Sequence, residues 1–171
     1  MSDIRVWCAS RDPYHCIFRM IRLMAAKGEP IPLEQLRVLD MFLMFPMLLH
    51  RLSLPAEIKE RFRLLKAPPP ASFFVRLPGT ASVWQDLQIY QSTALKRLTG
   101  LGILKRDALR DRYANLEVKM VPEEIMRQAI VQNDADKALI RFLVIDVCSL
   151  PMTGRDGLIK RAGLPSRGPV V

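Results

Sequence analysis

Residues 33–49, LEQLRVLDMFLMFPMLL, constrain the fold more than any other part of the chain. The segment begins with the spacing of an amphipathic helix and then becomes apolar on every face, with Asp40 as its last charged residue. A helix that is apolar all round must be covered by the rest of the chain or by a partner. It is too short to span a bilayer, which takes about 20 apolar residues. We therefore predict a buried helix, with a kink or a fresh helical start at Pro46, because proline lacks the N–H that a helix needs.

Asp40 is the unusual residue of this helix, because a buried carboxylate is costly unless it is paired. A metal site or an acid–base site would need a second carboxylate or a histidine at a matching spacing, and the sequence offers none beside it. We therefore expect Asp40 to pair with an arginine of the preceding helix, Arg19 or Arg22.

Helical patterns fill most of the remaining chain. Asp12 and Pro13 predict the start of the first helix and Gly28 its end. Further helices are expected over residues 56–66, from Thr80 or Ser82 to about residue 99, after Pro122, and over residues 138–147. The prolines within residues 67–71 favour an extended connector, followed by a short strand or extended segment over residues 72–77. We predict a helical subdomain (residues 1–66), the connector (residues 67–71) and a second subdomain with C-terminal helices and a tail (residues 72–171).

The second subdomain has the pattern of a winged helix-turn-helix. A helix ending near residue 99 is followed by a glycine turn at residues 100–102, a charged loop and the alternating stretch LEVKM at residues 116–120, which reads as a half-buried strand. The alternative is a helix followed by an unrelated hairpin. The predicted fold class is mainly α (α+β), a helical N-terminal half joined to a winged helix-turn-helix-like C-terminal half.

The charge balance permits a polyanionic partner, since 26 Lys and Arg residues face 17 Asp and Glu residues. Residues 96–119 hold seven basic and three acidic side chains. In a winged helix they would lie where phosphates are contacted, and the alternative is a solvated face of mixed charge. The candidate DNA-binding residues are Lys96, Arg97, Lys105, Arg106, Arg110 and Arg112.

No catalytic, cofactor or metal site is predicted. Cys8, Cys16 and Cys148 lie far apart, so we expect buried free thiols in a reducing cytosol rather than a disulfide or a zinc site. His15 and Cys16 are adjacent in a helix and do not face each other, which disfavours a catalytic dyad. No phosphate-loop, dinucleotide, serine-hydrolase or zinc-protease motif is present in the sequence. The N-terminus lacks the apolar region of a signal peptide, so we expect a cytoplasmic protein without a membrane partner.

Three strings carry a family resemblance: Asp-Pro-Tyr-His-x-x-Phe-Arg at residues 12–19, Leu-Arg-x-Leu-Asp at residues 36–40, and Phe45-Pro46. Residues 98–104 and the string GLIKRAGL at residues 157–164 add to it. The chain resembles the middle component of ABC three-component systems, which include the LmuC-like small subunit of Lamassu-type bacterial antiphage defence.

The resemblance implies a non-catalytic adaptor in a hetero-oligomer with an SMC- or Rad50-like ATPase and an effector, often a nuclease. Such systems sense invading DNA, so double-stranded DNA is a possible partner of the complex. The candidate structural or partner-binding residues are Asp12, Tyr14, His15, Asp40, Phe45 and Pro46. The alternative is a free-standing winged-helix transcriptional regulator, expected to be dimeric. The apolar excess, including nine methionines, favours the adaptor, because obligate interfaces are more hydrophobic than ordinary surface.

Overall fold

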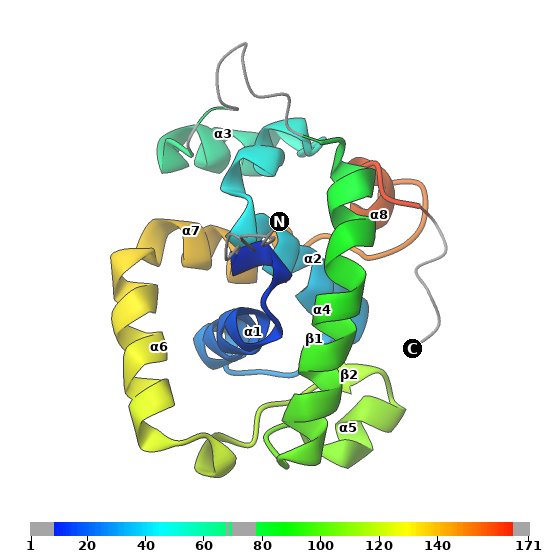
Figure 1. Ribbon diagram of the computed structural model, residues 1–171. Helices are drawn as coiled ribbons and strands as arrows, with labels where there is room; N and C mark the ends of the chain where they lie inside the picture. Colours follow the sequence, from blue (N-terminus) through cyan, green and yellow to red (C-terminus); the bar gives the residue numbers. More distant parts are fainter. Residues whose placement is uncertain (1–8, 68, 70–77, 166–171) are drawn as a thin grey trace, which may run out of the picture.

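The computed structural model describes residues 9–67, 69 and 78–165, and helices dominate that part of the chain (Figure 1). The α-helices are α1 (Pro13–Lys27), α2 (Leu33–Met44), α3 (Ala56–Leu65), α4 (Thr80–Gly100), α5 (Arg106–Arg110), α6 (Glu123–Ala135), α7 (Lys137–Arg141) and α8 (Leu158–Arg161). Short 3-10 helices are η1 (Ala9–Arg11), η2 (Pro46–Arg51) and η3 (Val118–Met120), and a π-helix, η4 (Phe142–Val147), continues α7. The strands are β1 (Ile31–Pro32) and β2 (Tyr113–Ala114). None of the helices in these ranges is both long enough and apolar enough to cross a membrane.

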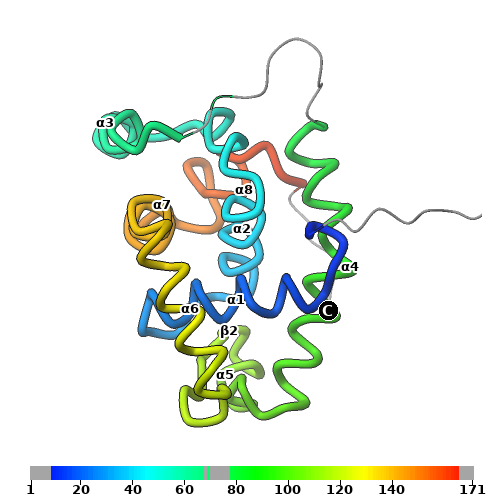
Figure 2. The backbone as a smooth tube through the Cα atoms, turned by 60° about the vertical axis from the view of Figure 1, so that its left-hand side comes forward, coloured from blue at the N-terminus to red at the C-terminus, as the bar shows by residue number. Residues whose placement is uncertain are grey.

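Helix α1 lies between α4 and α6 and contacts both (Figure 1). Figure 2 shows α1 running across the molecule and α2 running along it. The predicted ends of α1 are confirmed: the Asp12 side chain accepts a hydrogen bond from the Tyr14 N–H at 2.8 Å, and Gly28 ends the helix at φ +70°. Glycine suits that position because a left-handed backbone costs residues with a Cβ atom.

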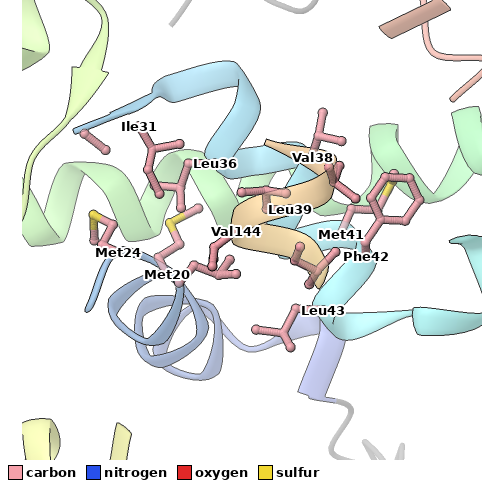
Figure 3. Packing of buried hydrophobic residues seen from close by; sticks show 14 of the residues in the cluster. Met20, Met24, Ile31, Leu36, Val38, Leu39, Met41, Phe42, Leu43 and Val144 are labelled. Atoms are coloured by element: carbon pink, nitrogen blue, oxygen red, sulfur yellow. The ribbon is translucent and has the colours of Figure 1, made fainter. Parts of the chain in front are cut away.

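Helix α2 is the buried centre that the sequence predicted. Every residue from 35 to 43 is buried. Figure 3 shows Leu36 and Leu39 of α2 close to Met20 of α1 and Val144 of η4. The helix ends at Met44, and Pro46 begins the 3-10 helix η2, so the fresh helical start at the proline is confirmed.

Both predicted subdomains contribute to one hydrophobic core, which includes Leu39 and Phe42 from the first and Trp84 and Val144 from the second. Strand β1 of the first pairs antiparallel with β2 of the second. The division of the chain into two subdomains stays a prediction. Residues 68 and 70–77, with most of the connector and the extended segment expected after it, lie outside the described residues.

The winged helix is not confirmed. Leu104 and Leu116, which lie before and after α5 in the sequence, form an isolated antiparallel bridge. The prediction of a strand that continues through residue 120 is wrong. That stretch closes into the 3-10 helix η3, with the Met120 N–H bonded to the Glu117 carbonyl at 2.9 Å. Val118 and Met120 are both more than half exposed, so the alternating apolar residues do not mark a buried strand face.

Candidate functional site

A polar network centred on Asp40 lies inside the core. The Asp40 carboxylate has no exposed surface. Its Oδ1 accepts a hydrogen bond from Arg19 Nε at 2.7 Å, and its Oδ2 accepts from Arg19 Nη2 at 3.3 Å and Gln91 Nε2 at 2.8 Å. The Cys16 thiol also donates to Oδ2, at 3.6 Å. The predicted arginine partner is therefore confirmed as Arg19, and this network links α1, α2 and α4.

Arg22, the other arginine proposed for Asp40, bonds to residues at the end of α6 instead. Its guanidinium donates to Asp136 at 2.6 Å and to Asn133 at 3.0 Å. The Asn133 amide in turn donates to the Arg22 carbonyl at 3.0 Å. This reciprocal set of bonds fixes α1 against the C-terminal end of α6.

Gln91 and Arg37 extend the network and were not singled out from the sequence. Gln91 donates to the Arg37 carbonyl at 3.0 Å and accepts from Arg37 Nε at 3.1 Å. Gln91 follows Trp84 and Leu87 on the buried face of α4, seven and four residues further along. A polar residue at that spacing among apolar ones was the signal that could have identified it.

The residues of the Asp-Pro-Tyr-His string contact different neighbours. His15 Nδ1 lies 2.7 Å from Arg19 Nη1, so it borders the Asp40 network. Tyr14 is exposed, and its hydroxyl accepts a hydrogen bond from Arg97 Nη1 at 2.7 Å. The Arg97 guanidinium also lies 4.8 Å from the centre of the Tyr14 ring. A predicted partner-binding residue and a predicted DNA-binding residue thus contact each other directly.

The predicted DNA-binding residues Lys96, Arg97, Lys105, Arg106, Arg110 and Arg112 are all exposed. We call them the basic end: they lie on the C-terminal part of α4, on α5 and beside it, at the lower right of Figure 1. Lys105 lies 3.7 Å from Glu117, Arg110 4.0 Å from Asp107, and Arg112 3.2 Å from Glu34. Exposed ion pairs of this kind are weak, so the cations remain able to meet an anion.

Comparison with protein families gives a match over nearly the whole chain. The sequence model of the ABC-three component (ABC-3C) system Middle Component 5 covers residues 5–167. The chain belongs to this family. It is thereby an accessory component of a multi-component system, and the resemblance to such middle components is confirmed. No curated protein and no solved structure gave a match.

Phe45 and Pro46 shape the end of the buried helix in this middle component. Phe45 is half-buried, and its N–H bonds the Met41 carbonyl at 2.9 Å as the last bond of α2. Pro46 then starts η2. Both lie away from the basic end, and a role of either in partner binding stays a prediction.

The expectation of buried free thiols in the middle component is met in part. Cys16 is buried, and burial together with the Asp40 charge raises the pKa of its thiol. Cys148 is half-buried rather than buried, and burial raises the pKa of its thiol to about 11. Cys8 lies outside the described residues. Both described thiols are therefore protonated at neutral pH, the form that is a poor nucleophile.

His15 is expected to make the middle component less stable in mild acid. Arginine only donates hydrogen bonds, so His15 Nδ1 must accept from Arg19 and must be unprotonated. Burial, and then the charge of Arg19, lower the pKa of His15 from 6.5. Below pH 6.5 the unfolded chain takes up a proton that the folded protein resists, so stability falls from there toward the folded pKa.

The measurement is urea unfolding of the wild type and His15→Gln between about pH 7.5 and 5.5. The wild type should lose more stability than the variant over this range, because glutamine has no titrating proton. An equal loss in both proteins would show that His15 does not titrate differently in the folded state.

Proposed function

We propose that this middle component is a cytoplasmic, non-catalytic adaptor subunit of a Lamassu-type defence complex. Its partners are an SMC- or Rad50-like ATPase and a nuclease-like effector, and the complex senses invading DNA. Family membership supports the accessory role, and the exposed apolar side chains of α6 and η4 support a protein partner.

The observation that carries the proposal is a groove of about 320 Å³ between α1, α6, α7 and η4, whose surface is mostly apolar although Asp134, Lys137 and Arg141 also line it. Ala25 and Ala26 of α1 line it together with Ile130 of α6 and Ile145 of η4. Ile130 and Ile145 are each 54% exposed although they lie at one site. Scattered apolar residues are normal on a surface, whereas adjacent ones mark an interaction site. A subunit that works inside an assembly needs such a surface.

In this proposal the basic end holds DNA within the assembled complex. Its residues are exposed and lie on the C-terminal part of α4 and around α5, whereas the groove involves α1, α6, α7 and η4. Phosphate contacts from exposed lysines and arginines position a protein on a duplex without reading its sequence. An adaptor that senses foreign DNA through an ATPase would use this kind of contact.

The test compares two sets of variants in the complex co-expressed from the neighbouring genes. Ile130→Asp with Ile145→Asp should abolish co-purification with the ATPase, because it places charge in an apolar interface. Leu64→Asp is the matched control, since Leu64 is 82% exposed on α3 and does not line the groove, and it should leave the complex intact. Lys105→Glu with Arg106→Glu and Arg110→Glu should preserve the complex and reduce the salt slope of DNA binding by up to about 2.7, since each phosphate contact contributes about 0.9.

Three results would count against the proposal. A soluble, stable dimer that shifts a specific operator would indicate the transcriptional regulator instead. Retention of the ATPase by the isoleucine variants would remove the groove from the interface. An unchanged salt slope would remove Lys105, Arg106 and Arg110 from the DNA contact.

A further inference from the structure

We propose that the middle component binds a small organic phosphate monoester in a pocket between the start of α2, the end of α4, and α5. We call it the Arg37 pocket. This ligand site goes beyond the adaptor function, and it requires neither DNA nor the other components.

Arg37 has bonding capacity that the protein itself does not use. The residue is 3% exposed, its Nε donates to Gln91, and its guanidinium lies 4.4 Å from the centre of the Trp84 ring. Its Nη2 is buried and has no hydrogen-bond partner among the residues that the structure describes. The nearby Asp40 carboxylate is already bonded to Arg19 and Gln91, and no ion pair of Arg37 is found among the described residues.

An arginine in this state is costly to the fold. Buried charges are normally paired, and a buried donor without an acceptor loses its hydrogen bonds to water without replacement. Burial lowers the pKa of Arg37, which shows the same cost, but arginine remains protonated in proteins. Arg37 also lines a pocket, so an anion bound there would lie beside a guanidinium that has no ion-pair partner among the described residues.

The pocket beside Arg37 has a volume of about 350 Å³, within the range typical of small-molecule sites. Lys96 of α4 and Arg112 after α5 also line it, and Glu34 is the acidic residue on its wall. Glu34 pairs with Arg112 at 3.2 Å. Three cations against one carboxylate leave the lining with a net charge of +2. The first turn of α2 adds partial positive charge, because Leu33 and Glu34 begin that helix.

The lining also indicates the rest of the ligand. Leu33, Leu95 and Leu109 form apolar walls around the charged groups. A phosphate monoester carries nearly two negative charges at neutral pH, which matches the lining, and an apolar or aromatic body would cover the leucines. A carboxylate supplies one charge. A DNA duplex is too wide for a pocket of this volume, so its phosphates would meet only the rim.

The experiment titrates the full-length protein with phenyl phosphate, benzoate and inorganic phosphate by calorimetry. Phenyl phosphate should bind at least about tenfold more tightly than either of the others, because only it supplies both the dianion and the apolar body. Arg37→Gln should weaken phenyl phosphate binding by about tenfold or more, and Lys96→Ala by about threefold to tenfold. Arg106→Ala is the matched control, an exposed cation of α5 outside the lining, and should leave binding unchanged.

Arg37→Gln is expected to fold with a moderate loss of stability, since the loss of the Gln91 hydrogen bond and of the Trp84 ring contact is offset in part by removal of a buried charge without an ion-pair partner. If that variant does not fold, Lys96→Ala alone decides, because Lys96 is exposed. The proposal is overturned if phenyl phosphate does not bind, if benzoate or inorganic phosphate binds equally well, or if Arg106→Ala weakens binding as much as Lys96→Ala. The last result would indicate general attraction to a basic surface. None of these results depends on the complex, so the adaptor function would stand or fall separately.

Discussion

Replacing Asp40 with alanine should lower the free energy of unfolding by about 3–5 kcal/mol, because removal of one partner leaves a buried charge without compensation. Arg19 is 2% exposed and donates to both oxygens of this carboxylate. Gln91 would also lose an acceptor. Urea unfolding followed by circular dichroism measures the loss.

Two further variants separate charge from shape. Asp40→Asn keeps the size and one oxygen acceptor, so its loss should be smaller than that of Asp40→Ala. Arg19→Met combined with Asp40→Leu removes both charges at similar volume and should recover most of the stability, as is common for buried ion pairs. A loss below about 1 kcal/mol for Asp40→Ala would show that Arg19 finds another partner or water. If the double variant were as unstable as Asp40→Ala, the other hydrogen bonds of the network would make the main contribution to stability.

The Asp40–Arg19 pair could be predicted because its reason is local. A carboxylate inside an apolar helix demands a cation, and the preceding helix carries arginines one turn apart on its buried side. The cap at Asp12, the glycine end at Gly28 and the restart at Pro46 were predictable for the same kind of reason, since each depends on the conformational limits of a single residue.

The strand expected at residues 116–120 could not be predicted reliably, because a strand needs a partner and an alternating pattern does not specify one. The partner of Tyr113 and Ala114 is Ile31–Pro32, far away in the sequence. Beyond Leu116 no neighbouring strand is available among the described residues, and the backbone bonds to itself as η3. The Arg37 pocket could not be predicted for the same reason. The cations of the basic end could be identified from the sequence as a cluster, but the position of Lys96 and Arg112 beside Arg37 depends on how α2, α4 and α5 pack.

Trp84 tests whether the two predicted subdomains fold as one unit. It is 2% exposed on α4, and its ring packs against the Arg37 guanidinium of α2. Trp84→Ala should cost about 3–5 kcal/mol, because it leaves a large cavity and removes the cation–π contact between the two parts of the chain.

Trp84→Phe is the control, because it keeps a ring facing Arg37 and should lose clearly less than alanine does. Since α1, α2 and α4 share one core and the Asp40 network, Trp84→Ala should still unfold in a single transition at a lower urea concentration. Circular dichroism reports all helices. In protein that also carries Cys8→Ser and Cys148→Ser, the reaction of Cys16 with a thiol reagent reports the opening of α1, because that thiol is buried in the folded protein. Coincident midpoints for the two signals would show one cooperative unit. A helical signal that persists after Cys16 becomes reactive would instead show that one subdomain stays folded while the other opens, and would place the boundary near the proline connector.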